Sequence, residues 1–373
     1  MTPHERGPRA APAPGERHLV HVFPTFAVGG SQRRFSILAS QFGNRFRHTV
    51  LALDGVTTAA ALCDPSVRLT VRGEILPKRR TVANILRARR LIAGLDGDWL
   101  VTYNWGAIEF ALAARTLRAV RHVHCEDGFG PEERDALLRR RIALRRLALG
   151  GAARVVVPSR GLARIATEAW KLPEARVAYV PNGVDTTRFA VDRLPRRASD
   201  AAPHIGTVAA LRPEKNLTRL LEAVARVKAV RPVRLTIVGE GPSRPMLERD
   251  AARFGFEPGR VFVGASNEPE RHLAAFDVFA LSSDTEQMPL TVLEAMAAGL
   301  PVATVDVGDV ATMLAEANRP FVVARDAGRL GDALAALISD DARRVAIGAA
   351  NRARAVEQFD LDAMVRSWRA LFD

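Results

Sequence analysis

Two glutamates, Glu286 and Glu294, are separated by seven residues and lie next to signals that start and stop a helix. Pro289 suits the first position of a helix and Gly299 suits a left-handed cap behind it, so we predict a helix over 289–298. One carboxylate would then lie on the loop before the helix and the other inside it. Ionised carboxylates only accept hydrogen bonds, so this pair suits the hydroxyl groups of a sugar.

The start of the same helix is suited to an anion. The amides of Leu290 and Thr291 belong to the first turn, which has no acceptors inside the helix and carries the positive end of its dipole. A phosphate group fits such a position. The segment Gly206–Asn216 adds Arg212 and Lys215 directly after a predicted strand. Taken alone, these two cations would be interpreted as ordinary exposed charge after a strand.

Strand-like and helix-like segments alternate from one end of the chain to the other, which predicts parallel sheets covered by helices. The predicted strands are His18–Phe23, Thr49–Leu53, Leu100–Thr102, Val120–His124, Arg154–Val157, His204–Val208, Arg234–Val238, Val261–Val263, Val278–Leu281 and Pro301–Thr304. The main predicted helices are Ser31–Phe42, Glu132–Leu149, Leu217–Val230 and Asp360–Phe372. Open sheets of this kind bind ligands beyond the carboxyl ends of their strands.

A length of 373 residues favours two domains. We predict an α/β chain of two doubly wound domains, with a hinge within Val180–Ala202, where proline, glycine and charged residues gather. The expected division is a disordered arm over 1–17, a first domain over 18–182, a second domain over 183–356, and a terminal helix over 357–373 that packs back on the first domain.

The excess positive charge lies entirely in the first half of the chain. Residues 1–185 hold 29 basic and 16 acidic residues, whereas residues 186–373 hold 25 of each. The basic clusters are Lys78-Arg79-Arg80 with Arg87, Arg89 and Arg90, and Arg139-Arg140-Arg141 with Arg145 and Arg146. No nucleic-acid-binding signature accompanies them, so an anionic membrane surface is the better partner, and a solvated surface is the alternative.

Compartment signals are few. The chain has only two cysteines, Cys63 and Cys125, which offer neither a disulfide framework nor a zinc site. No apolar run is long enough to span a bilayer, and the first residues lack the apolar region of an export signal. We therefore expect a cytoplasmic protein that can touch the inner face of the plasma membrane.

The segment around the two glutamates resembles the E-x7-E motif of glycosyltransferase family 4, which groups retaining enzymes of the GT-B fold. The flanking proline, the Leu-Glu-Ala-Met-Ala run and the Gly-Leu-Pro-Val end match as well. Further similar stretches follow in the family's order. They are Gly29-Gly30, Val180–Asp185 with Arg188-Phe189, Gly206–Asn216, Val238–Pro242 and Val261–Gly264, so the resemblance spans residues 18 to 370.

This resemblance implies two Rossmann-like domains that face each other across a cleft, with a C-terminal helix crossing back. It also implies a transferase that moves a sugar, with retention, from a nucleotide-diphosphate sugar to a carbohydrate or lipid-linked acceptor. The family's usual setting is bacterial exopolysaccharide or cell-envelope glycan synthesis. No metal and no cofactor other than the donor substrate is expected.

The resemblance also assigns roles to the first set of residues. Glu286 would hold hydroxyls of the transferred sugar, and Glu294 would hold the ribose of the nucleotide. Arg212 and Lys215 would stabilise the departing diphosphate. His124 corresponds to the family's cleft histidine near the donor sugar.

Other residues would shape the donor site. Gly29 and Gly30 would let the backbone approach the diphosphate, and Gly239 and Val263 would wall the nucleotide base. Leu290 and Thr291 would offer their amides to phosphate. Strand alternation places His122 and His124 on one face, so either could be the functional histidine. His21 is expected in the core.

The sequence departs from the family pattern at two places. Gln287 stands where the common form has glycine, and Asp306–Val310 replaces a Gly-Gly-x-x-Glu segment. The donor nucleotide, UDP or GDP, therefore stays open. The alternatives are a nucleotide-sugar epimerase of the same fold and a non-catalytic nucleotide- or glycan-binding module. A dehydrogenase is disfavoured because no Gly-x-Gly-x-x-Gly follows the first strand.

Overall fold

A computed structural model describes residues 16–77, 81–117, 120–133, 136–190 and 202–373. The basic run 78–80, most of the predicted arm 1–17 and most of the second half of the predicted hinge lie outside these residues. The chain forms two compact units. The first unit holds the chain up to Cys125 with Gly151–Ala153, and the second holds Glu126–Gly150 with Arg154–Asp373. The domain boundaries expected from the sequence remain a prediction.

The first unit carries five parallel strands in the order β3-β2-β1-β4-β5. They are β1 (Arg17–Phe23), β2 (Phe46–Ala52), β3 (Leu69–Gly73), β4 (Trp99–Tyr103) and β5 (Arg121–Cys125). Its helices are α1 (Gly30–Phe42), α2 (Thr81–Leu95) and α3 (Ile108–Ala114), with short 3-10 turns at Gly43–Arg45, Thr58–Leu62 and Trp105–Ala107. Strands β1, β2, β4 and β5 are largely buried and overlap predicted strands, whereas the residues of β3 are half-buried or exposed and β3 was not predicted.

Two strands of the second unit, β6 (Arg154–Val157) and β7 (Val177–Tyr179), complete this first sheet to seven strands. The second sheet has six parallel strands in the order β10-β9-β8-β11-β12-β13. They are β8 (His204–Val208), β9 (Arg234–Val238), β10 (Phe262–Gly264), β11 (Val278–Leu281), β12 (Val302–Val305) and β13 (Val322–Val323). The predicted α/β class with two Rossmann-like sheets is confirmed.

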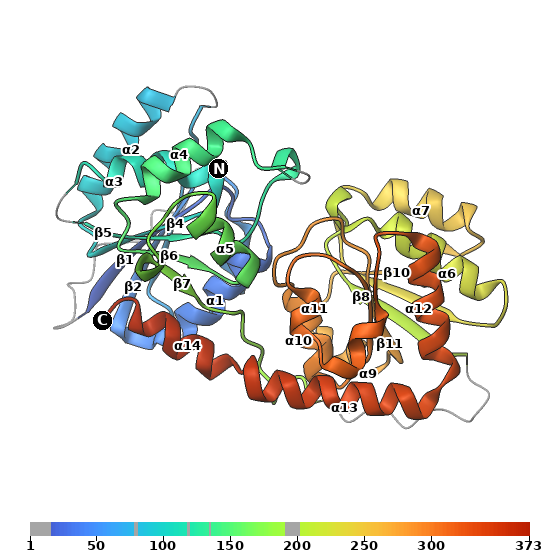
Figure 1. Ribbon diagram of the computed structural model, residues 1–373. Helices are drawn as coiled ribbons and strands as arrows, with labels where there is room; N and C mark the ends of the chain where they lie inside the picture. Colours follow the sequence, from blue (N-terminus) through green and yellow to red (C-terminus); the bar gives the residue numbers. More distant parts are fainter. Residues whose placement is uncertain (1–15, 78–80, 118–119, 134–135, 191–201) are drawn as a thin grey trace. The chain divides into compact units, whose positions relative to one another are not determined.

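Helices cover the second sheet, and α6 and α12 lie side by side (Figure 1). The helices of the second unit are α4 (Arg139–Leu149), α5 (Arg160–Glu168), α6 (Leu217–Lys228), α7 (Arg244–Arg253), α8 (Pro258–Val261), α9 (Pro269–Ala274), α10 (Leu290–Ala297), α11 (Val310–Met313), α12 (Ala327–Ser339), α13 (Asp341–Gln358) and α14 (Leu361–Ala370). Its 3-10 turns are Pro131–Glu133, Glu174–Arg176, Pro213–Lys215 and Glu316–Phe321.

The strand order of the second sheet reverses at β8, which lies between β9 and β11. In open parallel sheets, ligands bind outside the carboxyl ends of the strands at such a reversal, which is where the loops after β8 and β11 lie. The loop after β8 carries Lys215, and the loop after β11 carries Glu286. The fold thus brings together two predicted site residues that are 71 positions apart.

One predicted helix boundary is wrong. Glu132–Leu149 is not a single helix, because α4 begins only at Arg139 and a 3-10 turn precedes it. The carboxylate of Glu133 turns inward instead, and it accepts hydrogen bonds from the amide of Leu138 at 3.2 Å and from Arg145 at 3.0 Å. A smaller correction concerns Pro289, which is the extended cap residue before α10 and not its first helical residue.

Fewer arginines of the second basic cluster (Arg139-Arg140-Arg141 with Arg145 and Arg146) are exposed than the sequence suggests. Arg145 is fully buried between Glu126 and Glu133, and its guanidinium lies 5.1 Å from the centre of the Trp170 ring. Arg141 is buried as well and pairs with Glu133. Burial raises the pKa of Glu133, but hydrogen bonds from both arginines outweigh burial and hold the pKa below its ordinary value. These two arginines therefore serve packing.

Within the part of the chain that the structure describes, every helix is too short or too polar to cross a bilayer.

Candidate active site

Glu286 and Lys215 form the centre of the candidate site. The Lys215 ammonium donates to Oε1 of Glu286 at 2.5 Å, and the hydroxyl of Ser283 donates to the same oxygen at 2.8 Å. The Glu286 side chain is 11 % exposed and that of Lys215 is 25 % exposed. The pair is thus partly desolvated and still open to a ligand.

Several contacts hold the loops after β8 and β11 against each other. Asn216 adopts a left-handed conformation (φ 41°), accepts the Arg219 amide at the start of α6, and donates to both oxygens of Asp284 at 3.1 Å. Arg219 donates to Asp284 at 2.7 Å and to the carbonyl of Ser282 at 2.8 Å. The hydroxyl of Ser282 donates to the Lys215 carbonyl at 3.0 Å. These hydrogen bonds therefore fix the backbone of the two loops that carry Lys215 and Glu286.

Arg212 lies three residues before Lys215 on the same turn. Its side chain is exposed, and its carbonyl accepts the amide of Lys215 at 3.0 Å. On the other loop, α10 begins four residues after Glu286, with Leu290 and Thr291 half-buried in its first turn and Glu294 half-buried one turn later. The predicted cations, helix start and second glutamate thus belong to the same pair of loop–helix units.

The loop after β9 packs on the loop after β8 through glycine. Gly239 has φ 152°, and a Cβ atom added there would lie 1.9 Å from the carbonyl oxygen of Ala209. Its amide donates to the carbonyl of Gly264 at 2.8 Å, which ties the end of β9 to the end of β10. Val263 in β10 is 47 % exposed. Of the positions predicted to wall a base, Gly239 therefore lies directly after β9, which pairs with β8, and Val263 lies in β10, which pairs with β9.

Three predicted residues lie in the first unit. Gly29 is the extended residue before α1 and Gly30 is its first residue. His124 is fully buried in β5, and one of its ring nitrogens is 2.8 Å from the hydroxyl of Thr102. His21 is buried, as expected.

His122 and His124 share the hydroxyl of Thr102, since a ring nitrogen of each lies 2.8 Å from it. The prediction that both point to one face of the sheet is therefore confirmed. Burial, with a smaller effect of His124, lowers the pKa of His122 to about 3. His122 is thus neutral at physiological pH and is placed to hold Thr102.

The two departures from the family pattern both contact the start of α5. Asp309 accepts hydrogen bonds from the amides of Arg160 at 2.5 Å and Gly161 at 3.2 Å. Gln287 accepts the hydroxyl of Ser159 at 3.1 Å, and its carbonyl accepts the amide of Asp309 at 2.9 Å. A carboxylate at a helix N-terminus is favourable because it meets free amides and the positive dipole end. These residues thus connect the Glu286 loop to α5.

The sequence did not single out Asn216, Arg219, Ser283 or Asp284. Their sequence signal is weak. They are polar residues that follow a strand in the same segments as Lys215 and Glu286, and such residues often fix loop geometry. The described ranges contain no group of three or more His, Cys, Asp or Glu side chains placed to hold an ion. The arrangement offers fixed positive charge to an anion and carboxylate oxygens to hydroxyl groups.

Two family models match the chain. One described as "Glycosyltransferase Family 4" matches residues 28–188, and one described as "Glycosyl transferases group 1" matches residues 202–340. Together they include every residue predicted for the site, and the second contains both the Lys215 and the Glu286 loops.

Curated relatives are glycosyltransferases of bacteria. A GDP-mannose-dependent alpha-(1-6)-phosphatidylinositol monomannoside mannosyltransferase of Mycobacterium tuberculosis is 32 % identical over 52 % of this chain and 54 % of its own length. The lipopolysaccharide core biosynthesis glycosyltransferase LpsE of Rhizobium meliloti is 31 % identical over 58 % of this chain and 63 % of its own. The chain spans about half the length of the curated relatives it matches first.

Solved structures are similar to this chain in fold over nearly its whole length. Anabaena HepE in complex with UDP and glucose has a TM-score of 0.78 at 17 % identity, covering 95 % of this chain and 99 % of that one. Sucrose-phosphate synthase from Thermosynechococcus elongatus has a TM-score of 0.76 at 18 % identity, covering 96 % and 98 %. By fold and by both family models, the chain belongs to the family 4 glycosyltransferases of the GT-B type.

Proposed function

We propose that this chain is a retaining glycosyltransferase that moves a sugar from a nucleotide-diphosphate sugar to a carbohydrate or lipid-linked acceptor. The observation that carries the proposal is the Lys215–Glu286 pair on the loops that follow the neighbouring strands β8 and β11. Two relatives support a bacterial cell-envelope or exopolysaccharide setting, since they are a phosphatidylinositol monomannoside mannosyltransferase and a lipopolysaccharide core biosynthesis glycosyltransferase.

The proposed chemistry uses the charges of the two loops. When the glycosidic bond of the donor breaks, the diphosphate gains negative charge. Lys215, Arg212 and the first-turn amides of α10 would stabilise it, so we expect transfer to proceed in the presence of a metal chelator. Before the donor binds, Glu286 balances the Lys215 ammonium. When the diphosphate binds, Lys215 contacts a second anion. Glu286 then accepts hydrogen bonds from hydroxyl groups of the sugar, and Glu294 accepts them from those of the ribose.

The Glu286→Gln variant tests the proposal. The amide keeps the size of the side chain but loses the charge, so we expect sugar transfer to fall by about a hundredfold or more, while the binding of the nucleoside diphosphate stays within about threefold. Glu316→Gln, an exposed residue on another turn, is the matched control and keeps full activity. The assay follows transfer of labelled sugar from UDP- and GDP-sugars to a lipid extract.

The same assay separates the alternatives. An epimerase would change the sugar of the nucleotide without an acceptor. A binding module would bind nucleotide and produce neither product. Full transfer by Glu286→Gln would show that Glu286 does not hold the sugar and would overturn the proposed site.

We further propose that the protein works at the cytoplasmic face of an anionic membrane, where a lipid-linked acceptor is found. Helix α2 supports this, because it exposes Val82 (74 %) and Leu86 (52 %) beside exposed Arg89 and Arg90. Ile75, before the helix, is 68 % exposed. Apolar side chains flanked by arginines suit the boundary between headgroups and acyl chains.

Vesicle flotation tests the membrane proposal. Each arginine near an anionic surface contributes about 1 kcal/mol, so Arg89→Gln/Arg90→Gln should weaken binding to phosphatidylglycerol-containing vesicles by about thirtyfold. Arg249→Gln/Arg253→Gln on α7 removes the same charge elsewhere and should bind as the unchanged protein does. Equal binding by both pairs of variants, or no binding to anionic vesicles at low salt, would contradict the proposal.

A further inference from the structure

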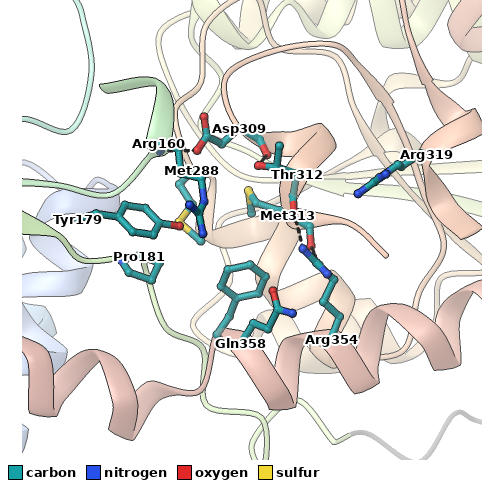
Figure 2. Close-up of a pocket in the computed structure, with 11 residues that line it drawn as sticks. Arg160, Tyr179, Pro181, Met288, Asp309, Thr312, Met313, Arg319, Arg354 and Gln358 are labelled. Carbon is teal, nitrogen blue, oxygen red and sulfur yellow. Dashed lines mark hydrogen bonds between the residues drawn. The ribbon is translucent and has the colours of Figure 1, made fainter. Parts of the chain in front are cut away.

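A pocket of about 420 Å³ lies in the second unit, lined by residues of α5, β7, α11 and α13 and by Met288 (Figure 2). Neither Lys215 nor Glu286 lines it. Its volume falls within the range of about 300–1,000 Å³ that is usual for small-ligand sites. The pocket is therefore a separate place where a small molecule could bind.

Positive charge dominates the lining. The charged residues are Arg160, Arg319, Arg354 and Asp309, which leaves an excess of two positive charges. The Asp309 carboxylate is engaged by the amides of Arg160 and Gly161 at the start of α5, so its charge is largely balanced within the protein. The field inside the pocket thus favours an anion.

Two of the arginines are held in place by the protein. The guanidinium of Arg160 lies 5.1 Å from the centre of the Tyr179 ring. Arg354 donates to the carbonyls of Met313 and Thr312, both at 2.8 Å (Figure 2). A guanidinium has five donors in a planar fork, so each of these arginines has donors beyond those already used and can bind phosphate oxygens.

The pocket also has one hydroxyl donor and an apolar wall. Burial raises the pKa of Tyr179 above its ordinary value, so the hydroxyl keeps its proton at neutral pH and can donate. The apolar side consists of Pro181 with the buried side chains of Met288, Met313 and Phe359. Such a wall suits the carbon face of a compact ring.

From these observations we propose that the pocket is a binding site for a small phosphomonoester such as a sugar phosphate. The phosphate binds to arginine side chains of the lining, and the ring packs on Pro181 and Phe359. This site is independent of the proposed donor site, because the two share no lining residue.

Calorimetric titration of the full chain with ribose 5-phosphate tests the proposal. We expect saturable binding to the unchanged protein, weaker binding of inorganic phosphate, and none of ribose. Arg160→Gln/Arg319→Gln removes two exposed cations and should weaken the binding of ribose 5-phosphate by about tenfold or more. Arg249→Gln, an exposed arginine on α7, is the matched control and should leave it unchanged.

A second variant distinguishes this site from the donor site. Lys215→Ala should leave the affinity for ribose 5-phosphate unchanged, whether or not it affects nucleotide binding. Loss of the sugar phosphate in Lys215→Ala would place the ligand in the donor site and overturn the proposal. The proposal also fails if the unchanged protein does not bind ribose 5-phosphate, if Arg160→Gln/Arg319→Gln binds it equally well, or if inorganic phosphate binds as tightly.

Discussion

The Oε1 atom of Glu286 accepts hydrogen bonds from both Lys215 and Ser283. A carboxylate held by two donors keeps one orientation, and its second oxygen adds further acceptor capacity for a ligand hydroxyl. The residue types and their spacing predicted Glu286 and Lys215 as site residues. The sequence could not predict their direct ion pair, because it depends on a contact between segments 71 positions apart.

At the residue scale, Gly239→Ala is expected to destabilise the second unit by about 2–4 kcal/mol. The added methyl would overlap the Ala209 carbonyl, and φ 152° is unfavourable for any residue with a Cβ. Urea unfolding of both proteins measures the change. Gly259→Ala is the matched control, since nothing lies within 4 Å of its added Cβ, and it should be near neutral. Equal stability of the two variants would refute the close approach at Gly239.

At the level of helices and strands, local sequence predicts most strands well, misses the short strands β3, β7 and β13, and places one helix start wrongly. Strands β8, β9 and β11 are short apolar runs bounded by turns, and all three match their predicted ranges. Helix α4 was predicted too long because Glu132 and Glu133 favour helices in isolation. Glu133 turns inward to pair with Arg145, and this pair determines the conformation there. A local sequence pattern does not contain that contact.

The contact between Asp309 and the start of helix α5 can be tested by mutation. Asp309→Ala removes the acceptor for two amides at the start of α5, so we expect the free energy of unfolding to fall by about 0.5–2 kcal/mol. Asp306→Ala, an exposed aspartate in the same loop, should change it little. Denaturant midpoints of the two variants measure the difference, and an unchanged midpoint for Asp309→Ala would show that the cap contributes nothing.

At the scale of the whole molecule, buried neutral histidines make stability depend on pH. Burial is the main cause that lowers the pKa of His48 to about 4, of His122 to about 3 and of His204 to about 4. Unfolding exposes these rings, and their pKa then returns to the ordinary value of 6.5. Between these values the unfolded chain binds more protons than the folded one, so stability falls as pH falls.

Calorimetric melting across this range checks the effect. Each histidine contributes about 1.4 kcal/mol per pH unit below 6.5, so the melting temperature should drop steadily from neutral pH to about pH 5. His204→Gln removes one of these proton-binding groups from the second unit, so the melting temperature of this variant should fall less steeply with falling pH. A melting temperature that stays constant over this range would contradict the burial of the three rings.

The most direct test of the central claim is the affinity for nucleoside diphosphates when Lys215 is replaced. We predict that UDP or GDP binds the unchanged protein, and that Lys215→Ala weakens this binding by about tenfold or more, because a charge-assisted contact to the diphosphate is lost. Lys228→Ala, on the exposed end of α6, controls for the loss of one positive charge. Equal nucleotide affinity of Lys215→Ala and the unchanged protein would contradict a donor site at the Lys215–Glu286 pair.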